Sequence, residues 1–323
     1  MATYDFAYAN KLFCFNLVTL EAESKGAETP IASFISLTSY LLEHAYNSQR
    51  TTLYAKINLI TIRLLLEDPV LCKRICAPES KVFVRLCRQR SPYLPLVRTE
   101  RVLAASILDT CIDGINHNLR RRLDIDLYIS FIALIQRLVS YLSRTRTRLE
   151  YHWSELFRSL LTLIRFLSTY AADLINLSDI DILLDTVTNV IALSLSTGET
   201  FLPTPAAYDD LFYKLVETGD ILTKFSDAYN LSKKPSNNIG TLIGVSKHYN
   251  QLLKDGVKGT AVKNLTSAQV AQVIKEGYET LDIQARDGLD TWERWREKEV
   301  RAFLKKVARG AVDDVKTLVQ GEK

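Results

Sequence analysis

The chain has 323 residues, 47% of them hydrophobic and 24% charged, and its net charge is +4. This composition is ordinary for a folded soluble protein, and the length exceeds what one compact core usually holds, which indicates two domains or one elongated array. The 12 glycines and 8 prolines are few and fall mostly between helical patterns, which favours long helices and argues against a sheet.

Charge is unevenly distributed along the chain. Residues 60–150 contain sixteen Lys or Arg and nine Asp or Glu, so this third carries +7 and the remainder −3. A basic face of this kind can meet anionic lipid, an acidic protein surface or nucleic acid. A solvated face with no partner is the more frequent outcome.

The five cysteines lie inside apolar helical patterns and are odd in number, which indicates free buried thiols in a cytosolic protein. Cys72 and Cys76 can share a helix face, but no histidine is near them in sequence, so no metal site is predicted. No cofactor is predicted either. The first twenty residues carry Asp5 and lack a basic leader, and no run of about 18 apolar residues is found, so we predict neither a signal peptide nor a membrane span.

Helical spacing of apolar residues predicts a series of helices in the first two-thirds of the chain. Thr29-Pro30 and Asp68-Pro69 each read as an N-cap followed by the first helical position. Residues 81–88 are ambiguous, and residues 91–96, with two prolines, are expected to form a loop. The predicted helices cover residues 4–22, 29–42, 51–66, 68–76, 99–119, 124–143, 151–174 and 178–196.

Residues 123–139 carry more than one apolar stripe on a single predicted helix, so this helix should have neighbours on at least two sides. Stacked helix pairs in an armadillo- or HEAT-like solenoid have this property. No fixed repeat is visible, so the repeats would be degenerate. The predicted fold class is all-α: an armadillo/HEAT-like solenoid with a C-terminal helical extension.

The stretch from Gly198 to Tyr213 punctuates the helical pattern. Gly198 is expected to end the preceding helix as its C′ residue. Pro203 and Pro205 keep the connection extended, and Thr204 should cap the next helix. A rigid inter-helix corner is the plainer interpretation, and a loop presented to a partner is the alternative.

The C-terminal third has a different pattern. One helix is predicted over residues 205–231, followed by a polar, proline-containing segment at residues 232–240. That segment is predicted to separate an armadillo-like array, residues 1–231, from a C-terminal helical region, residues 241–323. Further helices are expected at 241–254, from Thr266 onward and at 289–319.

Two arginine clusters follow predicted helix ends: Arg120–Arg122, and Arg144 with Arg146 and Arg148. Cations are favourable at helix C-termini, which is the simpler explanation. Arginine forks also pair with phosphate and carboxylate, so each cluster is a candidate contact. Because a helix of about 20 residues, about 30 Å long, separates the clusters, we expect them at opposite edges of the array.

Trp292 and Trp295 are three residues apart on one face of the last predicted helix. Core packing is the commoner role of such a stripe. The alternative is an amphipathic helix that lies on a membrane or in a partner's groove.

No catalytic set is recognised. No histidine has the spacing of a base or ligand, and there is no glycine-rich phosphate loop or nucleophile motif. His152 is expected to pack or cap a helix. A hydrolase or transferase would require a deep pocket with convergent ionisable groups, and nucleic-acid binding lacks an interleaved basic and aromatic surface.

Several motifs resemble one family in the same order along the chain. They are Asp126-Leu127-Tyr128-Ile129, Tyr151 to Leu156, Gly198 to Pro205 followed by Tyr208-Asp209, Gln269-Val270 with Tyr278, and Asp287 to Asp290 with Glu293. The chain is similar to the C-terminal conserved domain of the armadillo-like helical domain-containing protein 3 family. The similarity is strong from Leu123 to Asp290, weaker over the first 120 residues and loose after Trp295.

The resemblance implies a non-enzymatic, peripheral Golgi protein on the cytoplasmic side. It implies three partners: an Arf-like small GTPase, the large brefeldin-sensitive Arf exchange factor, and phosphatidylinositol 4-kinase beta. Through the kinase, the protein would maintain the level of phosphatidylinositol 4-phosphate at the trans-Golgi. Direct contact with an anionic membrane is the alternative. The candidate partner-binding residues are Arg144, Arg146, Arg148, Tyr151, Trp153, Phe201, Thr204, Tyr208 and Asp209, and Trp292 and Trp295 are the candidate membrane or partner helix.

Overall fold

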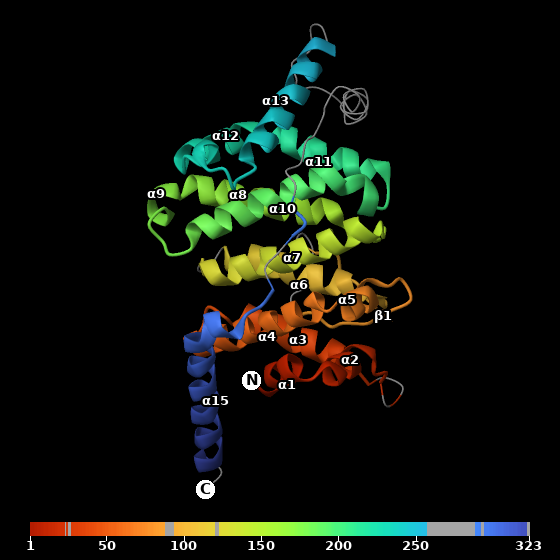
Figure 1. Ribbon diagram of the computed structural model, residues 1–323, viewed down its shortest axis with the longest axis vertical. Helices are drawn as coiled ribbons and strands as arrows, with labels where there is room; N and C mark the ends of the chain where they lie inside the picture. The colour runs from red at the N-terminus through yellow and green to blue at the C-terminus, as the bar shows by residue number, and fades with distance from the viewer. Residues whose placement is uncertain are drawn as a thin grey trace. The chain divides into compact units, whose positions relative to one another are not determined.

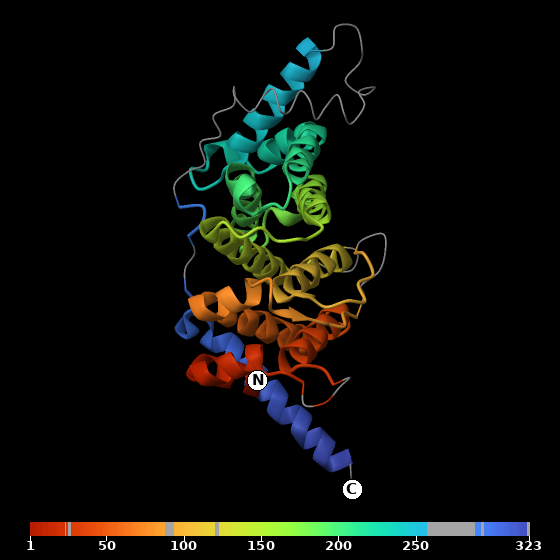
Figure 2. The same ribbon diagram turned by 90° about the vertical axis from the view of Figure 1, so that its right-hand side faces the viewer.

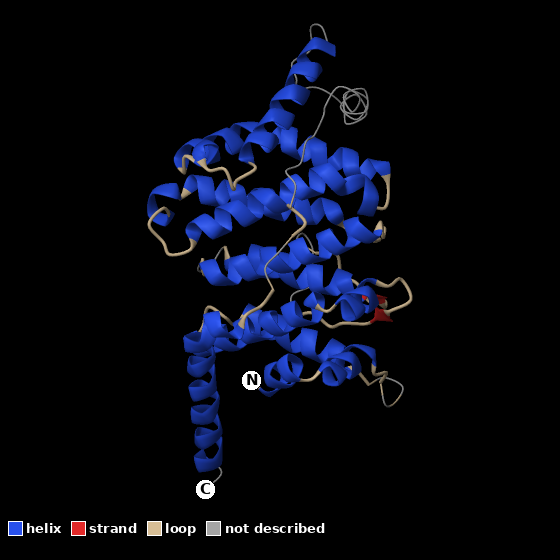
Figure 3. Ribbon diagram, in the orientation of Figure 1, coloured by secondary structure: helices blue, strands red, loops and turns tan. Residues whose placement is uncertain are grey.

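The computed structural model describes residues 1–22, 24, 27–87, 94–119, 123–256, 288–291 and 294–321. These residues are mostly helical, as Figure 3 shows, so the predicted all-α class is confirmed. Within them the strand structure is a single two-residue antiparallel ribbon, β1 (Lys81–Val82) with β2 (Arg101–Val102), in which Lys81 lies opposite Val102. Strand β1 lies in the segment whose sequence pattern is ambiguous, whereas β2 lies within the helix predicted over residues 99–119, which begins only at Leu103.

Two compact units are formed, and the C-terminal part of the chain belongs to the first of them. Unit 1 is Met1–Leu138 with Trp292–Lys323, and unit 2 is Val139–Thr291. This division differs from the predicted one at residues 232–240. Asn237 and Asn238 are buried and donate hydrogen bonds to Asp185 and Asn189, both at 2.7 Å, so this polar segment is packed within unit 2.

Unit 1 is built from layers of short and medium helices (Figures 1 and 2). Helix α4 packs against α1 and α3, α3 also packs against α6, and α2 packs against α5. Side-chain caps support the predicted helix starts: the Thr29 and Asp68 oxygens accept hydrogen bonds from Ala32 N and Val70 N. The helices are α1 (Ala2–Ala9), α2 (Lys11–Thr19), α3 (Pro30–Glu43), α4 (Gln49–Glu67), α5 (Pro69–Cys76) and α6 (Leu103–Asn118).

Helix α7 (Ile125–Thr145) has buried side chains on several sides, as its two-sided apolar pattern predicts. Its first half packs on α6, where the ring of Phe131 lies so close to Gly114 that a Cβ at this position would be 2.4 Å from it. The Tyr128 hydroxyl also donates to the carbonyl of Ile115 at 2.8 Å. Glycine at position 114 therefore permits the close approach of α6 and α7.

Unit 2 contains α8 (Trp153–Thr169), α9 (Ala171–Leu174), α10 (Ile180–Phe201), α11 (Pro205–Glu217), α12 (Gly219–Ala228) and α13 (Ile239–Gly256). Helices α11 and α12 both pack against α8 and α13. The prediction of a single helix over residues 205–231 is wrong, because one helix ends at Glu217 and the next begins at Gly219. At the break Gly219 approaches Ser246 so closely that a Cβ would lie 2.3 Å from its hydroxyl.

Helix α15 (Arg301–Gly321) starts later than the helix predicted over residues 289–319 and follows a short 3-10 turn at Glu297–Val300. Its first half packs on α4, with Leu304 and Val307 buried beside Tyr4 and Ile57. Its second half continues past the layer formed by α1 and α2 in both ribbon views (Figures 1 and 2). Contact with α4 extends as far as Asp314, which pairs with Arg50 and accepts a hydrogen bond from the Tyr54 hydroxyl.

Helices α7 and α10 are long and apolar enough to cross a bilayer by length and composition, which corrects the prediction that no segment qualifies. In each, 61% of the apolar window is buried inside the fold. Core helices of soluble proteins pass the same test, so this property is weak support for membrane insertion.

Candidate partner-binding surface

The connection between α10 and α11 forms the corner that the sequence predicts, but it begins later than predicted. Gly198 is not a C-cap: it lies inside α10, which continues to Phe201, and its carbonyl accepts from Leu202 N at 2.9 Å. Thr204 is extended and its hydroxyl accepts from Ala207 N at 3.3 Å. The predicted Thr204-Pro205 helix start is thus confirmed.

Gly198 has a packing role in place of the predicted capping role. A Cβ at this position would lie 2.6 Å from the ring of Tyr208, which is the fourth residue of α11. The Tyr208 hydroxyl donates to the carbonyl of Leu195, one turn earlier in α10. Burial raises the pKa of this hydroxyl, and the nearby charge of Glu199 adds to the increase. The two helices are therefore joined tightly at the corner.

Trp153 and Phe201, two predicted partner anchors, are buried in the core of unit 2. Their ring centroids are 5.0 Å apart at an interplanar angle of 63°, an edge-to-face contact. The Trp153 indole donates to the carbonyl of Leu149 at 2.9 Å, and Leu149 N donates to the carbonyl of Phe201 at 3.2 Å. Neither ring reaches the surface. Their role is to join the α10–α11 corner to the segment that carries Arg144, Arg146 and Arg148, which we call the arginine connection.

Tyr208 and Asp209 are also mostly buried, so the predicted surface role does not fit either side chain. Tyr151 is half-buried, with its ring centroid 4.1 Å from that of His152. Thr204, Pro205 and Ala206 are exposed at the corner, as is Glu199 near the end of α10. The aromatic residues therefore support the surface from beneath.

A cavity of about 250 Å³, which we call the corner pocket, opens where the arginine connection meets the corner. Arg148 donates to the carbonyls of Pro203 at 3.3 Å and Glu199 at 3.5 Å. The structure therefore brings three predicted residues together, and it adds Glu199 and Leu202, which the sequence interpretation did not single out. The lining residues are Arg148, Glu199, Leu202, Thr204, Pro205 and Tyr208.

The corner pocket is smaller than most small-molecule sites, which occupy about 300–1,000 Å³. Its floor is apolar, and a guanidinium and a carboxylate stand at its rim. Such a cavity suits one apolar side chain of a protein partner, while the rim charges orient that partner.

The other two arginines of the cluster behave differently. Arg144 forms an ion pair with Asp290 at 2.6 Å and donates to the Asp290 carbonyl at 2.9 Å. The Arg144 hydrogen bond holds the pKa of Asp290 below its ordinary value. Arg146 has a left-handed backbone, with φ of 51°, and an exposed side chain. Arg120–Arg122, the other predicted cluster, lie outside the described residues.

Trp295 packs within unit 1, while Trp292 lies outside the described residues. The Trp295 backbone N donates to the Glu67 carboxylate at 2.9 Å, and its indole donates to the Tyr4 hydroxyl at 3.3 Å. The Arg63 guanidinium lies 5.3 Å from the ring centroid. These contacts favour a structural role for Trp295 over contact with a membrane.

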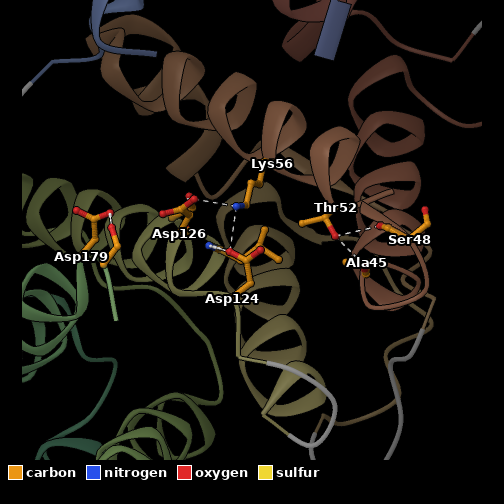
Figure 4. Close-up of polar contacts among 10 residues, drawn as sticks. Ala45, Ser48, Thr52, Lys56, Asp124, Asp126 and Asp179 are labelled. Atoms are coloured by element: carbon orange, nitrogen blue, oxygen red, sulfur yellow. Dashed lines mark hydrogen bonds and ion pairs between the residues drawn. The ribbon is translucent and has the colours of Figure 1, made fainter. Parts of the chain in front are cut away.

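A second hollow, of about 380 Å³, lies in unit 1 between the start of α4 and the start of α7. Figure 4 shows the Lys56 ammonium reaching the carboxylates of Asp124 and Asp126, at 3.0 and 2.9 Å. Asp124 also accepts from Leu127 N at 3.2 Å, and Thr52 bonds to the Ala45 carbonyl at 2.6 Å. These polar groups are already paired within the fold, which indicates a structural role.

No group of three or more His, Cys, Asp or Glu side chains among the described residues could hold a metal ion. Four of the five thiols are buried as predicted, whereas Cys87 is exposed. Burial raises the pKa of the Cys111 thiol. Thiols with a raised pKa are poor nucleophiles at neutral pH.

Comparison with known proteins places these features in a family. The profile described as armadillo-like helical domain-containing protein 3, C-terminal, matches residues 101–317. A UPF0588 membrane protein of Schizosaccharomyces pombe is 30% identical over 96% of this chain and 50% of its own length. The armadillo-like helical domain-containing protein 3 of Homo sapiens is 28% identical over 67% of this chain and 33% of its own, and that of Xenopus laevis is 29% identical over 65% and 32%.

No solved structure matches the chain. The chain spans about half the length of the yeast relative and about a third of the animal relatives. The family match begins at residue 101, so unit 2, with its corner pocket, lies entirely within it. The chain belongs to the armadillo-like helical domain-containing protein 3 family, in the region that corresponds to the family's C-terminal part.

Proposed function

We propose that this chain is a non-enzymatic scaffold of Golgi membrane trafficking that binds an Arf-like small GTPase through the corner pocket. In the same proposal it binds the large Golgi Arf exchange factor and supports phosphatidylinositol 4-kinase beta, and so phosphatidylinositol 4-phosphate. The proposal rests on the corner pocket. Arg148 bonds to the backbone of the α10–α11 corner beside this pocket, and all of its lining residues lie within the part of the chain that matches the family.

The rigidity of the corner favours protein binding. The Trp153–Phe201 contact and the Thr204 cap hold the corner in one conformation, so little conformational entropy would be lost when a partner binds. The switch segments of a small GTPase are ordered by the γ-phosphate. A rigid surface that accepts one ordered apolar side chain would therefore bind the GTP-loaded state more tightly.

Two features support the non-enzymatic part of the proposal. Both described hollows are lined by polar groups that bond within the fold, including the Tyr208 hydroxyl in one and Asp124 in the other. The armadillo-like helical architecture, which builds extended binding surfaces, is a second support.

The decisive test is the binding of the purified chain to an Arf-like GTPase loaded with a non-hydrolysable GTP analogue or with GDP. We expect retention of the GTP-analogue form to be about tenfold greater or more. Arg148→Glu should weaken this binding by about tenfold, because it places a carboxylate beside Glu199 at the pocket rim. Lys247→Glu, the same charge reversal on the exposed side of α13, should leave it unchanged.

Equal retention of the two nucleotide forms would contradict the GTPase assignment. In cells that depend on this chain, loss of the chain should lower Golgi phosphatidylinositol 4-phosphate, and the wild-type chain should restore it. If the level of Golgi phosphatidylinositol 4-phosphate is the same with and without the chain, the link to the kinase is contradicted.

Direct binding to an anionic membrane is the second candidate, and the second half of α15 favours it. Val312, Val315 and Val319 are more than half exposed and recur at helical spacing, with Lys305 and Lys316 beside them on the helix. The relative from Schizosaccharomyces pombe is named a membrane protein, which agrees with this candidate.

Flotation with liposomes, with and without phosphatidylinositol 4-phosphate, tests this candidate at low and high salt. We expect flotation at low salt that high salt weakens, and Val312→Asp with Val315→Asp should abolish it. Absence of flotation at low salt would eliminate direct membrane binding.

A further inference from the structure

A second corner of unit 2 exposes an apolar surface. Residues 170–182 run from the end of α8 through α9 to the first turn of α10. Four large apolar side chains in this segment are each 42–49% exposed: Tyr170, Ile175, Leu177 and Ile182. Single exposed apolar residues are ordinary on protein surfaces, but four large ones within thirteen residues form a concentrated patch. We call this surface the 170–182 corner.

The 170–182 corner is held in place by its buried residues. Leu174 and Ile180 are almost fully buried, and they alternate with the exposed apolar side chains. Successive turns are closed by backbone hydrogen bonds, including Ile175 N to the carbonyl of Ala171 at 2.9 Å and Leu177 N to that of Leu174 at 3.0 Å. The exposed set is therefore presented by an ordered backbone.

The charged side chains of the corner itself are all acidic. Residues 170–182 contain three Asp and no Lys or Arg, although the whole chain carries +4. Asp173, Asp179 and Asp181 lie within the corner itself and are exposed. Asp181 pairs with Lys234, and Asp179 accepts from the Ser178 hydroxyl at 2.7 Å. Three carboxylates therefore border the apolar patch, and one of them also faces the Lys234 ammonium.

We propose that the 170–182 corner is a docking surface for a basic amphipathic helix of a partner protein. The apolar face of such a helix would cover Tyr170, Ile175 and Leu177, and its Lys or Arg residues would face Asp173 and Asp179. Charge complementarity selects this occupant, since an anionic membrane would be repelled by the same carboxylates.

The probe for the test is a fluorescent, Leu- and Lys-containing amphipathic peptide of about 18 residues, long enough to form a helix when bound. Its counterpart replaces every Lys with Glu. In fluorescence anisotropy with the full chain at low salt, we expect the basic peptide to bind at least about tenfold more tightly than the acidic one. The chain carries a net charge of +4, so its overall charge does not favour the basic peptide over the acidic one.

Two variants locate the binding. Ile175→Ser with Leu177→Ser removes apolar contact area, and Asp173→Lys reverses one charge; each should weaken binding of the basic peptide about tenfold. All three residues are exposed, so the unfolding midpoint should stay unchanged. The matched controls, Leu318→Ser and Asp313→Lys, alter exposed residues of α15 in unit 1 and should leave peptide binding unchanged.

The proposal is overturned if the two peptides bind equally, or if the corner variants bind the basic peptide as well as the wild-type chain does. Self-association of the chain that Ile175→Ser with Leu177→Ser abolishes would overturn the choice of a separate partner. Arg148→Glu should leave peptide binding unchanged, so failure of this proposal is distinguishable from failure of the GTPase assignment.

Discussion

The two exposed corners of unit 2 use aromatic residues in opposite ways. At the α10–α11 corner, Phe201 and Tyr208 face inward, and a single arginine side chain from a neighbouring connection forms the outer rim. At the 170–182 corner, Tyr170 and Leu177 face outward and the border is acidic. One corner therefore presents a small, charged cavity, and the other an apolar surface.

The packing partners of each segment explain this difference. Phe201 meets the ring of Trp153 from α8, and Tyr208 meets Gly198 and Phe212, so these side chains lie between helices. The ring of Tyr170 instead meets that of Phe166, one turn earlier at the end of α8, with the ring centroids 4.7 Å apart. Aromatic residues at an inter-helix connection therefore mark a binding surface only where no second helix covers them.

The largest expected contrast between the corners is in stability. Phe201→Ala should lower the free energy of unfolding by about 3–5 kcal/mol, because it removes a fully buried ring. Tyr170→Ala should change it by about 0.5 kcal/mol or less, because half of the side chain is already in water. Chemical unfolding followed by tryptophan fluorescence measures both. Similar losses would show that the 170–182 corner is packed in solution.

Glycine substitutions sharpen the account of the α10–α11 corner. Gly198→Ala places a methyl group against Tyr208, and we expect a loss of about 1–3 kcal/mol from overpacking. Gly244→Ala in α13 is the matched control, because open space surrounds it. That variant should gain about 0.5–1 kcal/mol from helix propensity. A stabilising Gly198→Ala in the same unfolding experiment would contradict the close contact.

Two buried tyrosines of unit 2 differ in their hydroxyl groups. The Tyr208 hydroxyl donates to Leu195, whereas the Tyr249 hydroxyl is buried with no hydrogen-bond partner among the described residues. Tyr208→Phe should therefore cost about 1 kcal/mol, and Tyr249→Phe should be neutral or stabilising. Unfolding midpoints at neutral pH compare the two variants.

Alkaline pH extends this comparison. Burial raises the pKa of Tyr249 to about 12, with the charge of Asp209 as a smaller cause. The unfolded value is about 10, so the unfolded chain loses this proton first. The contribution of the protonated Tyr249 hydroxyl to the stability of the fold is therefore complete below about pH 10 and is lost as the pH rises toward 12. Tyr249→Phe should reduce this alkaline loss, and an unchanged pH profile would contradict the burial of Tyr249.

The smallest expected effect concerns the arginine connection. Arg144→Met should raise the pKa of Asp290 toward its ordinary value, and a carboxyl NMR titration measures the change. The lowered pKa stabilises the fold above the unfolded value of about 3.9, and this contribution disappears as the pH falls through the folded value. Since the pair is exposed, the change in stability at neutral pH should stay below about 1 kcal/mol. An unmoved Asp290 titration would show that the pair does not form in solution.

The candidate surfaces were only partly predictable. Arg148 and Thr204 were predicted as contacts because arginine, proline and a capping threonine are visible in the sequence. Phe201 and Trp153 were predicted as anchors but are buried, since an aromatic residue beside a proline looks the same whether or not another helix covers it. The 170–182 corner has a signal that can be found in the sequence: four large apolar residues and three aspartates without a basic residue between positions 170 and 182.

The sequence by itself determined the helical class, the helix starts at Thr29, Asp68 and Thr204, and the family, because caps and apolar periodicity act over a few neighbouring residues. Tertiary structure alone decided that Gly198 lies within a helix, that residues 232–240 pack within unit 2, and that Trp295 returns to Glu67. Each of these outcomes depends on contact with a residue at least ten positions away, and the free energy of burial is set by such distant neighbours.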